Sequence, residues 1–233
     1  MARIGLYTEL ELEKAAEVFR EEFLELRPSE DLVYLFFIRR KKILTNRHEH
    51  FRIEVQNLGH FHRRFWESEY GTMSITTNVI CVTVDLQNNE ARFGPIGNIA
   101  MLPQGMGLGT VLMGQAIKWL LVNHPKTSIR EGRLSGSDTP SEEKRKRRHS
   151  FYEGFGFSVV YTNKEEPEGR FFAECVERLT PKQGKGSFVD VESFASEAGK
   201  TKSQNADLIE QVSKLRERRR QLGSGPIDFR GVA

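Results

Sequence analysis

The sequence predicts a mixed α/β fold in which helices flank a central sheet, and three observations lead to this prediction. Strand patterns over residues 78–86 and 96–102 precede an apolar helical pattern over residues 107–123. A glycine-rich turn separates the second strand from that helix. Further along, two apolar segments, 157–162 and 171–179, have the length and spacing of a hairpin.

The N-terminal part is predicted to contain one strand and two helices. Residues 3–7 have a short strand pattern, and apolar residues over 12–26 recur at helical spacing. A second helix is expected over residues 32–36, after the break at Pro28. Residues 47–70 have no clear pattern beyond a short strand-like alternation.

The middle of the chain alternates between helix and strand. A strand is expected over residues 128–134, and the next helix begins near Pro140 and Ser141 and ends near Gly156. In the helix over 107–123, the residues expected to face the sheet are Leu112, Ala116, Ile117 and Leu120.

Composition predicts a globular protein with one main domain and an extension. The chain has 233 residues, of which 38% are hydrophobic and 29% are charged, and its net charge is +3. We expect a main domain over residues 1–180, a polar linker over 181–204 and a helical extension over 205–233. The extension carries an apolar seam made of Leu208, Val212, Leu215 and Leu222. No segment has the length of a membrane span and the N-terminus does not resemble a secretory signal, so we expect a cytoplasmic protein without a membrane partner.

The glycine-rich turn contains Gly105, Gly107 and Gly109, directly before the helix. Backbone N–H groups and the positive end of a helix dipole converge at such a turn, and glycine lets a phosphate approach closely. The spacing matches neither the phosphate-binding loop with lysine nor the dinucleotide fingerprint. Taken alone, the motif supports a phosphate loop and a plain connecting turn about equally.

Two motifs in order resemble the GNAT superfamily of acetyl-CoA-dependent N-acetyltransferases. Gln104-Gly105-Met106-Gly107-Leu108-Gly109, preceded by Pro103, resembles its pyrophosphate loop. Tyr152, followed four residues later by Gly156-Phe157, resembles its later signature. The resemblance covers roughly residues 72 to 180. It implies a GNAT-type mixed, mostly antiparallel central sheet flanked by helices, here with a C-terminal helical extension.

The resemblance also implies a site. Acetyl-CoA would be the co-substrate and Tyr152 the general acid that protonates the leaving thiolate, since a phenol is still protonated at neutral pH. The pantetheine arm would be lined by Ile99, Ala100 and Met101. The pyrophosphate would be bound by Gln104, Gly105, Met106, Gly107, Leu108, Gly109 and Thr110.

The acceptor would be a primary amine attacked in a ternary complex, but the sequence does not name it. A small amine, a protein amine and an aminoacyl-tRNA stay open. For the general base, only side-chain type suggests Glu69, Asp138 or His149. A different kind of function also stays open: an acyl-CoA-binding module that catalyses nothing and acts through a partner protein, with the C-terminal helix as the element that binds the partner or a second copy.

A basic run lies within two turns of Tyr152, where the family often has an Asn. Such a run is usually a solvated helix face, but next to a reactive centre it could attract RNA or another anion. The run is made of Lys144, Arg145, Lys146, Arg147 and Arg148.

Four histidines form two H-x-H pairs, and on a strand each pair would project to one face. They are His48, His50, His60 and His62. No cysteine or aspartate pair completes a ligand set, so we expect surface or acceptor-cleft histidines and no metal site.

Overall fold

The computed structural model describes residues 6–30, 32–56, 77–94, 101, 105–134, 141–161, 168–197 and 200, together with 210, 213, 214 and 217. The chain divides into two compact units, Met1–Val189 and Asp190–Ala233. In the described part of the second unit, residues 191–197 form a helix that Asp190 caps by accepting hydrogen bonds from Ser193.

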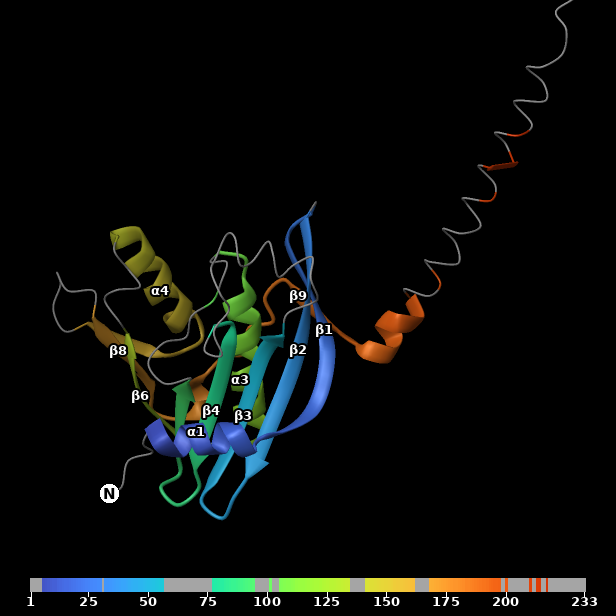
Figure 1. The fold of residues 1–233 in the computed structure, drawn as a ribbon. Coiled ribbons are helices and arrows are strands. Elements are labelled where there is room, and N and C mark those ends of the chain that lie inside the picture. Colours follow the sequence, from blue (N-terminus) through green and yellow to red (C-terminus); the bar gives the residue numbers. More distant parts are fainter. Residues whose placement is uncertain are drawn as a thin grey trace, which may run out of the picture. The chain divides into compact units, whose positions relative to one another are not determined.

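The first unit is an α/β structure with one sheet (Figure 1). The order of its described strands is β7-β8-β6-β5-β4-β3-β2-β1-β9. The strands are β1 (Glu17–Ser29), β2 (Leu32–Leu44), β3 (His48–Gln56), β4 (Val79–Asp85), β5 (Glu90–Gly94), β6 (Ser128–Leu134), β7 (Ser158–Tyr161), β8 (Gly169–Ala173) and β9 (Gly186–Asp190). The helices are α1 (Leu6–Ala15), α3 (Leu108–Asn123), α4 (Glu142–Gly154) and the short η1 (Val176–Arg178).

The sheet is mixed and mostly antiparallel, as expected. Neighbouring strands from β1 to β5 pair antiparallel, and so do β6 with β8 and β7 with β8. The exception is the parallel pair of β5 and β6, which α3 connects. Because a crossover helix is the usual link between parallel strands, α3 has to lie on one face of the sheet.

Three expectations for the middle of the chain are confirmed. The strand expected over 78–86 is β4, the helix over 107–123 is α3, and the strand over 128–134 is β6. Of the strand expected over 96–102, only Met101 is among the described residues, and it is not in a strand. The strand β5 was not expected. α4 begins after Ser141, whose side chain accepts a hydrogen bond from the N–H of Lys144. The four α3 residues expected to face the sheet, Leu112, Ala116, Ile117 and Leu120, are fully buried.

The N-terminal helix predictions are wrong beyond Ala15, where α1 ends. Residues 17–29 and 32–44 form the long hairpin of β1 and β2. Leu24 and Leu26 are fully buried, whereas Phe23 and Glu25, which alternate with them, are only partly buried. The period is therefore two, and the apolar matches at helical spacing were coincidental. Where a strand was expected at residues 3–7, Leu6 and Tyr7 belong to α1, and residues 3–5 lie outside the described part.

Two C-terminal elements also differ from expectation. The strand expected over 171–179 ends at Ala173 as β8, and η1 follows it. Within the range expected as a linker, Gly186–Asp190 forms β9 at the edge of the sheet beside β1. The four leucine and valine positions of the expected seam lie outside the described residues.

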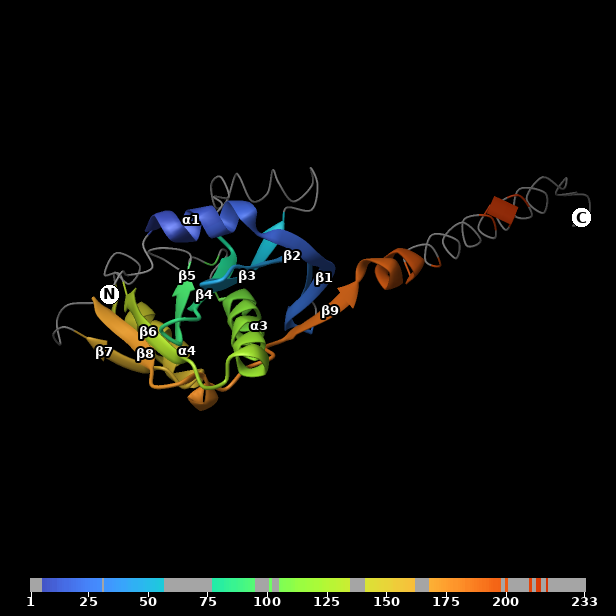
Figure 2. The ribbon, with the colours of Figure 1, turned by 90° about the horizontal axis from the view of Figure 1, so that it is seen from below.

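The two faces of the sheet are covered differently. α1 lies on one face, and α3 and α4 lie on the other (Figure 2). The apolar core fills the space between the sheet and α3, where the Trp119 ring stacks on Phe51 with centroids 4.9 Å apart. Among the described residues, no helix is long and apolar enough to cross a membrane.

Candidate functional site

The site is built around a fork between β5 and β6. These parallel strands pair only at Glu90 with Ser128 and at Ala91 with Ile129. Beyond these pairs β5 continues to Gly94 beside β4, and β6 continues to Leu134 beside β8. The strands therefore separate toward their carboxyl ends, which is where ligands bind in open α/β sheets.

A glycine turn leads into α3, the helix that follows β5 in the chain. Gly105 and Gly107 both have φ of +88°, a conformation that glycine adopts without steric cost. Gly107 is also the N-cap of α3, and no side chain caps the helix there. A Cβ built at either glycine meets no described atom within 4 Å. No side chain caps the first N–H groups of α3, and these are the donors that an anion site would use.

Tyr152 lies near this turn through its neighbour Phe151. A Cβ built on Gly109, in the first turn of α3, would lie 3.7 Å from Phe151 Cε2 and 3.1 Å from Met101 Cγ. The Phe151 ring in turn packs edge-on against Tyr152, with centroids 5.2 Å apart. The start of α3 and the end of α4 are therefore neighbours.

The ring of Tyr152 is part of an aromatic cluster. It stacks on Phe171 with centroids 4.3 Å apart, and the side chain is only 7% exposed. The backbone of α4 ends just beyond it, and Gly156 follows with φ of +90°, as the sequence predicts for a helix end. Phe155 and Phe157, which follow Tyr152 in the chain, are also buried.

The structure describes only part of the predicted site. The described members are Tyr152, Met101, Gly105, Met106, Gly107, Leu108, Gly109 and Thr110. Ile99, Ala100 and Gln104 lie outside the described residues, as do two of the three candidate bases, Glu69 and Asp138. The third, His149, is on α4 and its Nε2 lies 3.0 Å from Glu153 Oε1.

The basic run occupies the first two turns of α4. Lys144, Lys146 and Arg147 are exposed. Lys146 forms an ion pair with Glu142 at 2.8 Å. The guanidinium groups of Arg145 and Arg148 lie over the Tyr161 ring, 5.8 and 5.9 Å from its centroid.

Of the four histidines, the described two are buried rather than on the surface. His48 and His50 lie on the face of β3 that is opposite the apolar core, and they are 9% and 0% exposed. His50 Nδ1 lies 2.8 Å from Thr83 Oγ1, and its Nε2 lies 3.3 Å from Glu13 Oε2. His60 and His62 lie outside the described residues, and within the described ranges no group of His, Cys, Asp and Glu could hold a metal ion.

His50 belongs to a polar cluster beneath α1, which we call the α1-facing cluster. Alternate β3 residues point to this face, and α1 supplies carboxylates above them. Arg52 Nε lies 2.9 Å from Glu13 Oε1 and also pairs with Glu54, whose Oε1 is 3.2 Å from Lys41 Nζ. The cluster consists of Glu9, Glu13, Lys41, His50, Arg52, Glu54, Cys81 and Thr83.

Sequence patterns indicate little of this cluster. The alternation of His48, His50, Arg52 and Glu54 with apolar residues is a strand pattern, and it would have placed those four on one face. No local sequence pattern indicates that Glu9 is buried, because its burial depends on the sheet beneath α1.

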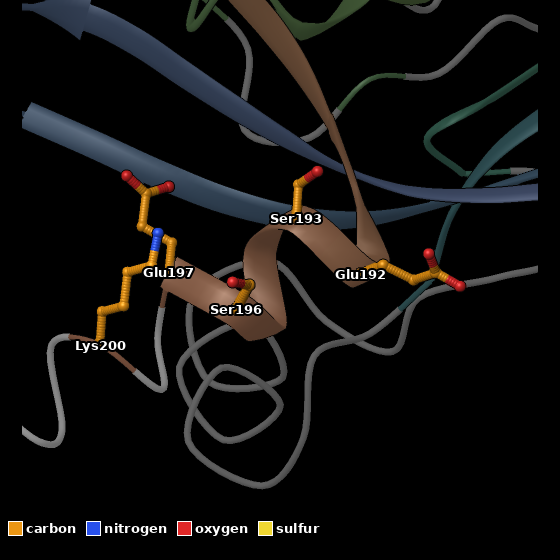
Figure 3. A pocket seen from close by; sticks show the side chains of 5 residues that line it. All are labelled: Glu192, Ser193, Ser196, Glu197 and Lys200. Atoms are coloured by element: carbon orange, nitrogen blue, oxygen red, sulfur yellow. The ribbon is translucent and has the colours of Figure 1, made fainter.

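A hollow in the second unit is a poor candidate by comparison. It is lined by Glu192, Ser193, Ser196, Glu197 and Lys200 (Figure 3). All five are exposed, and the two glutamates point away from each other. None of these five lining residues is a buried polar group that could orient a ligand, so the hollow is not a convincing binding site.

Comparisons with protein-family models, curated proteins and solved structures gave no match. Function is therefore argued from the fork, the glycine turn and the side chains around them.

Proposed function

We propose that this protein is an acetyl-CoA-dependent N-acetyltransferase that transfers an acetyl group to a primary amine by direct attack in a ternary complex. One observation carries the proposal: a glycine turn with two positive φ angles and no side-chain cap precedes α3 beside a fork of parallel strands. That arrangement suits a diphosphate with a long arm attached. The diphosphate would accept hydrogen bonds from the N–H groups at the start of α3, and the arm would extend between β5 and β6.

The chemistry requires a held thioester, an uncharged amine and a proton for the departing thiolate. In the proposal the amine nitrogen bonds to the thioester carbon, the C–S bond breaks, and the Tyr152 phenol gives its proton to the sulfur. The proximity of Phe151 to Gly109 supports this role, because it brings the end of α4 to the turn that would hold the diphosphate.

The first test is to incubate the protein with labelled acetyl-CoA and cell extract, and to identify the labelled acceptor by mass spectrometry. Transfer of the label to protein, RNA or a small amine supports the proposal and names the acceptor. If the protein does not bind acetyl-CoA in calorimetry and no label is transferred, the proposal is wrong.

The role of Tyr152 has its own prediction. Tyr152→Phe keeps the ring and its stacking on Phe171 but removes the phenol proton. We expect the transfer rate to fall by about 10²- to 10⁴-fold, the usual contribution of a general acid, with acetyl-CoA affinity nearly unchanged. The matched control is Tyr161→Phe, a tyrosine on β7 whose ring lies beneath two arginines, which we expect to leave the rate unchanged.

A second candidate function is an acyl-CoA-binding module without catalysis. The burial of Tyr152 in the aromatic cluster favours it, because a packed tyrosine at 7% exposure also serves simply as core. This function predicts tight acetyl-CoA binding without transfer to any acceptor, and no effect of Tyr152→Phe on that binding.

A further inference from the structure

Glu9 is a buried carboxylate without an ion pair among the described residues. It lies on α1 and is 5% exposed. Its described partner is the Cys81 thiol, whose Sγ donates to Oε1 at 3.4 Å. Burial first, and then the negative charges of Glu9 and Glu13, raise the pKa of Cys81 well above its ordinary value, so the thiol stays neutral. Among the residues that the structure describes, Glu9 therefore has only a weak, uncharged donor.

Its neighbours in the α1-facing cluster are better satisfied. Glu13, one turn further along α1, pairs with both His50 and Arg52. On β5, Arg92 precedes Gly94 by two residues and shares its face of the sheet, but no ion pair joins it to Glu9 in the described structure. Leaving a buried carboxylate without a cation is costly, so such a group is a strong acceptor for a cation that arrives with a ligand.

The position of Glu9 relates it to the fork. A Cβ on Gly94 would overlap Glu9 Oε1 and would lie 2.9 Å from Cys81 Sγ, so the carboxylate lies directly against the β5 backbone. Gly94 ends β5, three residues or about 10 Å beyond the last pair with β6 at Ala91. The carboxylate thus lies where the strands have separated.

Glu9 and Tyr152 come from opposite faces of the sheet. Glu9 comes from α1, whereas Tyr152 comes from α4 on the same face as α3 (Figure 2). Acetyl transfer needs this kind of arrangement, because a proton leaves the nitrogen on one side of the carbonyl carbon and another reaches the sulfur on the other side.

We propose that Glu9 binds the ammonium group of the acceptor and acts as the general base. The inference rests on the proposed acetyl transfer, and it defines the acceptor as a cationic primary amine that enters from the α1 side. The ammonium gives one proton to a Glu9 carboxylate oxygen and becomes a neutral amine. The nitrogen then bonds to the acetyl carbon while the C–S bond breaks, and its second proton replaces the one that Tyr152 gives to the thiolate. Glu9 finally releases its proton to water.

The experiment compares the full-length wild-type protein with Glu9→Gln, which keeps the shape of the side chain but removes its charge and basicity. Transfer from labelled acetyl-CoA to trace acceptor in cell extract gives kcat/KM. We expect Glu9→Gln to lower kcat/KM by about 10²- to 10⁴-fold. Acetyl-CoA affinity, measured by calorimetry, should change less than threefold.

Two further variants serve as controls. Glu9→Asp keeps a carboxylate and should retain about a tenth of the wild-type rate. Glu11→Gln, an exposed position on the same helix, should match the wild type.

The outcomes separate the two proposals. If the wild-type protein transfers label and Glu9→Gln does so within threefold, the role of Glu9 is refuted and acetyl transfer stands. If the wild-type protein neither binds acetyl-CoA nor transfers label, both proposals fail. Loss of transfer in Glu9→Gln, with acetyl-CoA binding intact and partial recovery in Glu9→Asp, supports the inference.

Discussion

At the scale of single residues, backbone conformation decides what the glycine turn can do. Gly107 has φ of +88°, and a Cβ there would meet open space among the described atoms. An alanine would therefore cost conformational energy but cause no clash. The sequence correctly indicated these glycines as special. It could not show which of them have positive φ, because Gly109 is also in the motif yet lies inside the helix.

We expect Gly107→Ala to lower the free energy of unfolding by about 1–2 kcal/mol, the cost of left-handed backbone for an L-residue. If the turn binds a diphosphate, acetyl-CoA affinity should fall as well, since the N–H groups would turn away. Urea unfolding and calorimetry measure the two effects. The control is Gly105→Ala, which has the same φ but does not cap α3. A Gly107→Ala protein as stable as the wild type would contradict the assigned conformation.

At the scale of elements, a segment of the chain that packs across α3 holds this helix in place. A Cβ on Gly114 would overlap the main-chain oxygen of Lys182, and a Cβ on Gly184 would lie 2.9 Å from Val111 Cγ2. The segment between η1 and β9 therefore packs closely on α3. Sequence patterns predicted α3 because its apolar period is strong over four turns. They missed this crossing segment, whose polar composition resembles a linker.

Gly114→Ala reverses a usual rule. In a free helix alanine is favoured over glycine by about 1 kcal/mol. Here we expect a net loss of about 1–3 kcal/mol, because the added methyl group meets backbone that cannot rotate away. Thermal and urea unfolding measure the change. Val122→Ala, on the exposed side of the same helix at 74% exposure, should change stability by less than about 0.5 kcal/mol. A stabilised Gly114→Ala protein would show that the segment does not pack as described.

At the scale of the whole molecule, the apolar core covers one face of the sheet, apart from the buried ion pair of Glu22 and Arg40, and charged side chains line much of the other face. The β1 and β2 predictions failed for this reason. Buried leucines on one face alternate with charged residues that pair across the other, and Glu21 of β1 bonds Arg39 of β2 at 2.9 Å. Strands with many charges lack the composition that single-sequence rules associate with a sheet. Such strands are recognisable only once their partners are known.

The charged face also predicts how the molecule responds to acid. Burial alone would raise the pKa of Glu13, but the hydrogen bond from His50 and the charge of Arg52 outweigh it and lower the pKa below 4.5. A carboxyl whose pKa is lower in the folded state adds stability above its unfolded pKa, and this stability is lost as the pH falls through the folded value. Glu13→Gln should therefore be less stable than the wild type at pH 7, and the difference should shrink below pH 4.5. Urea unfolding between pH 7 and 3 measures both curves, with the exposed Glu11→Gln as the control. A difference that stayed constant down to pH 3 would mean that Glu13 is not held charged by His50 and Arg52, and that the α1-facing cluster does not join α1 to the sheet electrostatically.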